Sequence, residues 1–201
     1  MKIRLLVPVL CLFIAAAAFA ADTAPVADQA ALIAQLERTQ ARFLASVEGL
    51  SEAQWNYKAA PDRWSIAECA EHITASEPFM RNMIAESVKT ELAADAAGTT
   101  NQDQKILTFL VDRSTKFKAP EPLIPTNRFG TPAAAMAAFK KERGETIALA
   151  SGDVDLRTHG SKHFALGPLD SYGWFLFLSA HSERHTLQID EVKASPGYPK
   201  E

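Results

Sequence analysis

Four long segments of this 201-residue chain carry apolar residues at helical spacing, and this pattern restricts the fold more than any other feature. In the first segment, residues 28–50, leucine, phenylalanine and valine recur at near-helical spacing, as in an amphipathic helix: Leu32, Leu36, Phe43, Val47 and Leu50. The other segments cover residues 65–91, 131–151 and 168–194. Because no convincing strand pattern accompanies them, the sequence predicts an all-α four-helix bundle.

Two of the predicted helices begin at recognisable capping residues. Ser65 is followed three positions later by Glu68, which is the spacing of a capping box. Thr131 precedes Pro132, and proline is favoured at the first helical position.

The segments between the predicted helices differ in length and composition. Residues 92–130, between the second and third helices, are predicted to form a crossover of loop and proline-rich extended chain. One short helix is expected within it, from residue 105. Residues 152–167 are predicted to be a loop that leads into the fourth helix at about residue 168.

The first 20 residues have the three parts of a secretory signal peptide. Lys2 and Arg4 precede an apolar run over residues 5–19, and "AFA" forms a small-residue cleavage site that ends at Ala20. The run is shorter than the roughly 20 residues that span a bilayer, so cleavage without a stable membrane anchor is expected. The sequence therefore predicts that residues 21–201 form a single domain, which is exported to a bacterial periplasm.

The charge and cysteine content of the predicted mature chain exclude some partners and bonds. Of the 21 basic residues, two lie in the leader, which leaves 19 against 24 acidic residues and a net charge of −5. An acidic chain without a basic stripe is not expected to bind nucleic acid. Cleavage also leaves Cys69 as the one cysteine, so no intramolecular disulfide is expected and the core alone must stabilise the fold.

The fourth predicted helix contains "HSERH", which places His181 and His185 four residues apart. At about 100° per residue, both lie in the middle of the apolar stripe together with Gln188, whereas Glu183 points the other way, towards solvent. A buried imidazole needs partners for its nitrogens. Two interpretations therefore stay open, namely a metal ion bound by the pair and two core histidines bonded to neighbouring groups.

His72 lies on or near the buried side of the second helix and can complete a set of three nitrogens. Three protein ligands with an open position are typical of a catalytic metal site, while structural sites have four. Cys69 and His163 are reserve ligands, although a buried cysteine is more often core filling and a loop histidine more often lies outside the ligand set. Gln188 is expected to orient an imidazole or the substrate, and Arg184 to pair with an acid on a neighbouring helix.

Two familiar site types do not match the sequence. "HSERH" differs from the zinc-protease pattern "HExxH", because its glutamate occupies the third position. No "CxxCH" is present, which excludes a covalently attached c-type haem.

The segments "RWSIAECAEHI" and "GPLDSYGWFLFLSAHSERHTLQIDEVK" resemble the two signature segments of the DinB-like superfamily. In that family a tryptophan-serine start opens a helix with one histidine, and a late helix carries "HxxRHxxQI". The resemblance implies a four-helix bundle in which His72, His181 and His185 bind a divalent ion, commonly zinc or nickel, with manganese or iron as alternatives. Relatives often have "HPxFG" where this chain has "KHFALG", so the proline after His163 is absent.

Three hypotheses for the function follow. The first is a metal-dependent enzyme that acts on a small molecule, either as a thiol S-transferase or as a hydrolase. Relatives resemble enzymes that use bacillithiol or mycothiol, which are cytosolic thiols, whereas the leader predicts export. The second is a non-catalytic bundle that binds metal or a small ligand, its site closed by Cys69 or His163. The third is a bundle with three core histidines and no metal. Bundles of this kind are also often homodimers.

Overall fold

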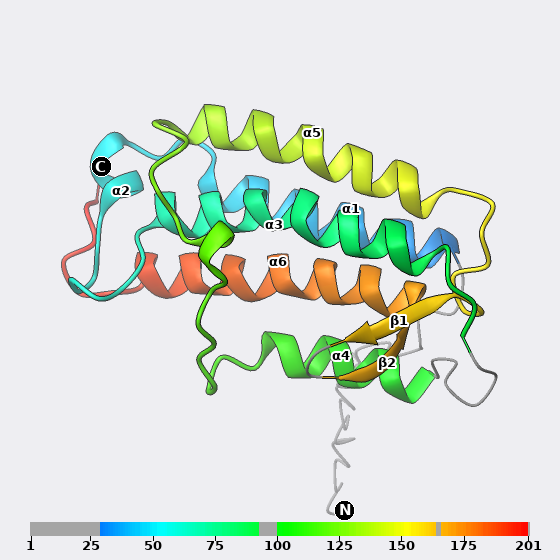
Figure 1. Ribbon diagram of the computed structural model, residues 1–201. Helices are drawn as coiled ribbons and strands as arrows, with labels where there is room; N and C mark the ends of the chain where they lie inside the picture. The colour runs from blue at the N-terminus through cyan, green and yellow to red at the C-terminus, as the bar shows by residue number, and fades with distance from the viewer. Residues whose placement is uncertain (1–28, 93–99, 164–165, 201) are drawn as a thin grey trace, which may run out of the picture.

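The computed structural model describes residues 29–92, 100–163 and 166–200, so the predicted leader lies outside the described residues. Its four long helices lie side by side as a bundle, which confirms the predicted fold class (Figure 1). They are α1 (Gln29–Val47), α3 (Ile66–Ser87), α5 (Pro132–Ala150) and α6 (Ser171–Lys193). A short helix, α2 (Glu52–Asn56), connects α1 to α3. Among the described residues, no helix combines the length and apolar composition needed to span a bilayer.

Helix α6 is surrounded by other helices. It packs against α1, α3 and α4 (Thr100–Val111), while α5 covers α1 and α3 on the other side of the bundle. The expectation that Glu183 faces solvent is therefore wrong. Its carboxylate is buried against α1, where it forms ion pairs with Arg42 and, at 3.5 Å, with Arg38. The apolar periodicity did not reveal this second buried face, because ion pairs rather than apolar side chains fill it.

The predicted helix starts are confirmed in atomic detail. Ser65 Oγ accepts a hydrogen bond from the Glu68 amide at 3.2 Å, and the Glu68 carboxylate accepts one from the Ser65 amide at 2.7 Å. Thr131 Oγ1 accepts from the Ala134 amide at 3.2 Å, directly before Pro132. Each bond satisfies an amide that the first helical turn leaves without an intrahelical partner. The first cap fixes where α3 begins and hence where His72 falls.

The crossover between α3 and α5 is confirmed, but it contains more helix than predicted. Helix α4 begins at Thr100, five residues before the predicted start at Lys105, and packs along α6. The chain then passes over α3 through the 3-10 helix η1 (Glu121–Leu123). We call residues 120–128 the strap, because they lie across α3 beside His72.

Arg184 fixes the end of α4. Its guanidinium donates hydrogen bonds to the carbonyl oxygens of Leu110, at 2.9 Å, of Asp112 and of Thr115. The last carbonyls of a helix have no intrahelical partner, so Arg184 caps α4. The prediction that Arg184 pairs with an acid on a neighbouring helix is therefore wrong.

The predicted loop before the last helix contains a small antiparallel hairpin, so the loop prediction is wrong at residues 160–163 and 167, and the helix prediction is wrong at residues 168–170. Strands β1 (Gly160–His163) and β2 (Gly167–Asp170) pair with Gly160 opposite Asp170. Four-residue strands are too short for a clear alternation of polar and apolar residues. A Cβ at Gly160 would lie 2.3 Å from the carbonyl oxygen of Leu169, so only glycine fits there. Asp170 Oδ1 then accepts from the Gly173 amide at 2.6 Å and starts α6 at Ser171 rather than at Pro168.

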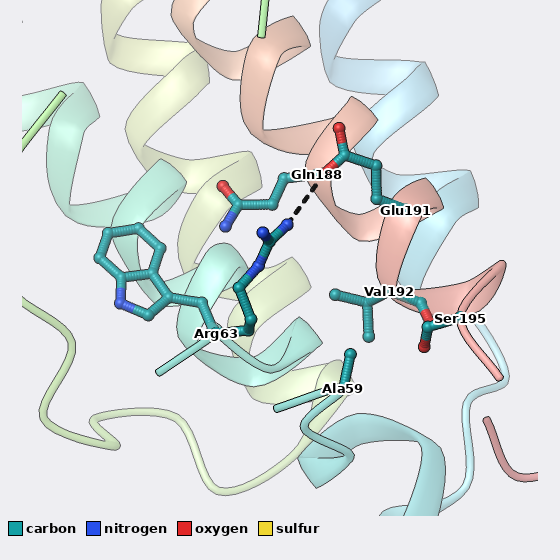
Figure 2. A pocket seen from close by; sticks show the side chains of 7 residues that line it. Ala59, Arg63, Gln188, Glu191, Val192 and Ser195 are labelled. Carbon is teal, nitrogen blue, oxygen red and sulfur yellow. Dashed lines mark hydrogen bonds and ion pairs between the residues drawn. The ribbon is translucent and has the colours of Figure 1, made fainter. Parts of the chain in front are cut away.

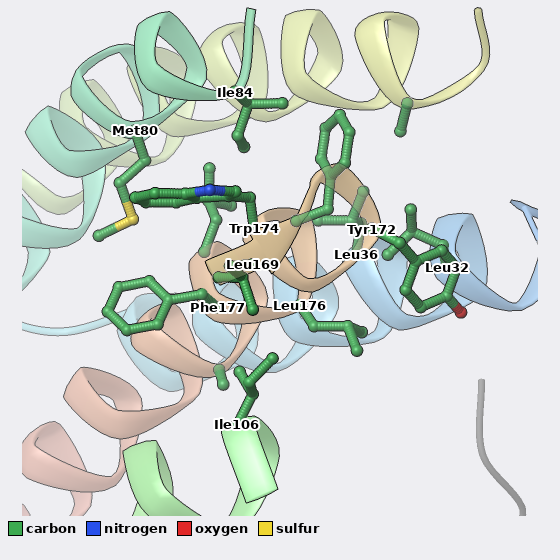
Figure 3. Close-up of a cluster of buried hydrophobic side chains, with 14 of the residues drawn as sticks. Leu32, Leu36, Met80, Ile84, Ile106, Leu169, Tyr172, Trp174, Leu176 and Phe177 are labelled. Carbon is green, nitrogen blue, oxygen red and sulfur yellow. The ribbon is translucent and has the colours of Figure 1, made fainter. Parts of the chain in front are cut away.

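The core consists of two apolar clusters with a polar layer between them, which contains the buried ion pair of Glu77 on α3 with Arg143 on α5. Figure 3 shows the first, where Trp174 and Phe177 of α6 pack with Leu36 of α1 and Met80 of α3. Along α6, the first cluster ends at Ala180 and the second begins at Ile189. Both histidines of α6 fall in the interval between these two clusters. The fold thus places them in a polar layer inside the bundle.

Candidate metal centre

Three histidines from two helices meet at the polar layer. His72 comes from α3, and His181 and His185 come from α6. Each offers a ring nitrogen, and the three nitrogens lie within 4.8 Å of one another. Among the described residues, this is the one group of three or more histidine, cysteine or acidic side chains that meets so closely. The helical spacing of α6 brings two of the nitrogens together, and the packing of α3 on α6 adds the third.

The distance between two of the nitrogens suits a shared ion. His72 Nε2 lies 3.1 Å from His181 Nε2. Two nitrogen ligands at about 2.0–2.1 Å from a tetrahedral zinc ion are about 3.3 Å apart. Small side-chain rotations are therefore enough to bring both onto one ion.

The outer nitrogens of two rings are fixed by hydrogen bonds. His72 Nδ1 lies 2.9 Å from the carbonyl oxygen of Leu123, and His185 Nδ1 lies 2.9 Å from Gln188 Oε1. Both partners are acceptors, so both Nδ1 atoms carry the hydrogen. In the neutral rings the lone pair is then on Nε2, which is free to bind a metal. Gln188, for which the sequence predicted contact with an imidazole or the substrate, thus contacts the ring of His185.

The three rings are neutral near pH 7. Burial lowers the pKa of His72 below its usual range, and the hydrogen bond to Leu123 acts in the opposite direction. Burial also lowers the pKa of His181 and His185 well below that range, and the neighbouring rings lower each further. Neutral imidazole is the form that binds metals. His72 is buried, whereas His181 and His185 are half-buried, so the cluster is accessible to solvent on one side.

The reserve ligands Cys69 and His163 lie outside the cluster. Cys69 is buried in the second apolar cluster, and burial raises the pKa of its thiol above the usual range. His163 lies at the end of β1, and its ring centroid is 4.8 Å from that of Trp174 and 4.4 Å from that of Phe177. Burial lowers the pKa of His163 to about 4. Neither residue closes the histidine cluster as a fourth ligand.

A buried glutamate next to His72 holds the strap in place. The Glu71 carboxylate accepts hydrogen bonds from the amides of Thr126, at 2.6 Å, and Arg128, at 2.8 Å. These bonds fix the strap against α3 and so hold the Leu123 carbonyl beside His72. Sequence reasoning missed Leu123, because a backbone carbonyl in an irregular segment leaves no pattern in the side chains.

Trp64 forms one wall of the cluster and was also missed. Its ring centroid lies 4.9 Å from that of His72 and 6.0 Å from that of His185. Trp64 directly precedes Ser65, the cap of α3. In the sequence, only its position in the segment "RWS", eight residues before His72, indicated that Trp64 could lie near the site.

These features define a helical-bundle protein with a three-histidine cluster shared by two of its long helices. The family model of the DinB superfamily matches residues 35–189, and the chain belongs to this superfamily. The resemblance in the two histidine-bearing segments is thereby confirmed.

Two proteins of Bacillus subtilis are similar to this chain. YuaE, from strain 168, is 28% identical over 148 residues, which cover 73% of this chain and 88% of YuaE. The solved structure of YfiT has a TM-score of 0.54 at 15% identity and covers 85% of this chain and 89% of its own. YfiT is described as a probable metal-dependent hydrolase with an unusual four-helix bundle topology.

Proposed function

We propose that His72, His181 and His185 bind one divalent metal ion and that the loaded protein is a hydrolase acting on a small molecule. The observation that carries this proposal is the meeting of three imidazole nitrogens within 4.8 Å on one half-open face. Three nitrogen donors suit zinc or nickel, with manganese or iron as alternatives. When bound, such an ion supplies Lewis-acid chemistry, which activates water and polarises a carbonyl.

The protein residues hold and orient the ligands. Leu123 and Gln188 keep the Nδ1 hydrogens of His72 and His185 on the outer side, so the Nε2 lone pairs are available to the ion. Trp64 covers one side of the rings and limits the access of water. The half-buried His181 and His185 leave a side from which a substrate can enter.

Two observations favour an enzyme over a closed storage site. Cys69 and His163, the candidates for a fourth ligand, both lie outside the cluster. A site with three protein ligands keeps a position for an exogenous molecule. The description of YfiT as a probable metal-dependent hydrolase supports the same reaction class.

The leader sequence supports water rather than a cytosolic thiol as the second reactant. We propose that the protein acts after export, because residues 1–20 have the composition of a signal peptide. N-terminal sequencing of the protein from a periplasmic extract tests this, with Ala21 expected as the first residue. A full-length chain found only in the cytosol would contradict export.

The reaction class is tested with the protein stripped by a chelator and reloaded with zinc or nickel. Small esters, amides and lactones are offered as substrates in water, and an aryl halide with a small thiol is offered in parallel. Metal-dependent hydrolysis that His185→Ala abolishes supports the proposal. Turnover that requires the thiol indicates a transferase instead. Bound metal without any turnover indicates a binding protein.

A further inference from the structure

A pocket of about 230 Å³ lies next to the histidine cluster (Figure 2). Two of its lining residues touch the cluster: Trp64 packs on the rings of His72 and His185, and Gln188 accepts from His185 Nδ1. Pockets for drug-sized ligands are about 300–1,000 Å³, so this one fits a smaller molecule. Its remaining lining residues are Ala59, Arg63, Glu191, Val192 and Ser195.

The charged residues that line the pocket are Arg63 and Glu191, and Arg113 binds Glu191 from outside the lining. Arg113 Nε and Nη2 bind Glu191 at 2.6 and 2.9 Å, and Arg63 Nη2 reaches the same carboxylate at 3.4 Å. Two guanidinium groups thus share one carboxylate beside the proposed metal site. A bound divalent cation adds to this positive charge, and the field at the pocket favours an anion.

The two arginines differ in how firmly they are held. Arg113 is 18% exposed, and its third nitrogen also contacts the Arg184 carbonyl at 3.4 Å and Gln188 at 3.5 Å. Arg63 is 40% exposed. The one hydrogen bond of its guanidinium among the described residues is the long contact to Glu191. In Figure 2 its side chain extends across the pocket towards Gln188 and Glu191. Arg63 is therefore the guanidinium that is able to exchange partners.

We propose that this pocket binds the substrate and that the substrate is a small molecule with a carboxylate group. The carboxylate replaces Glu191 on Arg63, because a guanidinium binds a carboxylate through two parallel hydrogen bonds. The indole of Trp64 packs against the apolar part of the molecule and directs its reactive end to the histidines. This inference rests on the proposed function, since it assigns a substrate class to that metal centre.

The test compares benzoate with benzamide, which have nearly the same shape and differ in charge. Each is titrated by NMR into chelator-treated wild-type protein and into variants. Benzoate is expected to bind about tenfold more tightly than benzamide, and Arg63→Gln is expected to reduce this ratio to about one. Glu191→Gln is expected to tighten benzoate binding, because it releases Arg63; a misfolded variant would not give such a gain.

Arg38→Gln is the matched control, since Arg38 is an exposed arginine on α1 that pairs with Glu183 outside the pocket. It is expected to leave the ratio unchanged. The proposal is overturned if wild-type protein shows no preference for benzoate, or if Arg63→Gln keeps the preference.

The use of metal-free protein separates this inference from the proposed function. A preference for benzoate that appears only after zinc is added places the carboxylate on the ion, which overturns the pocket assignment and supports the metal site. An Arg63-dependent preference in a protein that binds no metal supports the pocket and overturns the proposed function.

Discussion

His72 Nδ1 donates a hydrogen bond to the Leu123 carbonyl at 2.9 Å, and this bond connects the histidine cluster to the strap. The strap is in turn held by the buried Glu71 carboxylate, which accepts from two of its amides. Glu71 therefore positions His72 through the strap, although its side chain is not part of the cluster.

Glu71→Gln is expected to weaken zinc binding by about 10- to 100-fold, the usual effect of losing a group that orients a ligand. In wild type, the backbone amides of Thr126 and Arg128 each donate to a different oxygen of the Glu71 carboxylate. The side chain of glutamine has only one acceptor oxygen, so one of these two hydrogen bonds is lost. A competition titration with a chromogenic chelator measures the affinity. Glu86→Gln, on the exposed face of the same helix, is the control and is expected to have no effect. Equal affinities for both variants would show that the strap does not position His72.

Arg143→Met is expected to destabilise the protein by about 3–5 kcal/mol, because it leaves Glu77 buried without its partner. The two side chains are fully buried and bonded at 2.6 and 3.1 Å. Urea unfolding followed by circular dichroism measures the loss. Lys141→Met, an exposed change on the same helix, is expected to stay within about 0.5 kcal/mol of wild type. If the two variants unfold alike, the buried pair does not stabilise the polar layer.

Cys69 is expected to be unreactive in the folded protein. Its side chain is buried, and burial raises the pKa of the thiol, so the thiolate that reacts with reagents or binds metal is scarce near neutral pH. A thiol reagent should label it quickly in guanidinium chloride and slowly in buffer. Cys69→Ala is expected to keep the full zinc content. Loss of zinc from this variant would make Cys69 a ligand.

Two glycines give opposite expectations for substitution by alanine. Gly160→Ala is expected to lower stability by about 1–3 kcal/mol, because the new Cβ meets the backbone of β2 at 2.3 Å. Gly144→Ala, in an exposed part of α5 with nothing within 4 Å, is expected to raise it by about 0.5–1 kcal/mol. Thermal unfolding of both variants measures the difference. A stable Gly160→Ala protein would mean that the hairpin does not pack as described.

The sequence predicted those features that depend on helical periodicity or on capping residues. His181, His185 and Gln188 share a face because of their spacing, and Ser65 fixes the start of α3. The polar interior was not predictable in the same way. Glu77 and Arg143 have the residue types of a solvated surface, and only the packing of α3 against α5 shows that they are buried together.

The hairpin and the strap were missed for a different reason. Both are set by backbone contacts between segments far apart in the chain, such as Leu123 with His72 and Gly160 with Thr90. Local residue patterns contain little information on such contacts. The sequence therefore identified the histidines of the candidate centre, but not the groups that orient His72.

The central claim is tested most directly by the metal content of the untagged protein after incubation with zinc, nickel, manganese or iron in separate samples, followed by gel filtration. Mass spectrometry of the metal is expected to find about one equivalent in wild type and almost none in His181→Ala. His159→Ala removes a half-buried histidine outside the cluster and is expected to keep the full equivalent. Absence of zinc, nickel, manganese and iron from wild type, or full retention in His181→Ala, would contradict the assignment of the metal centre.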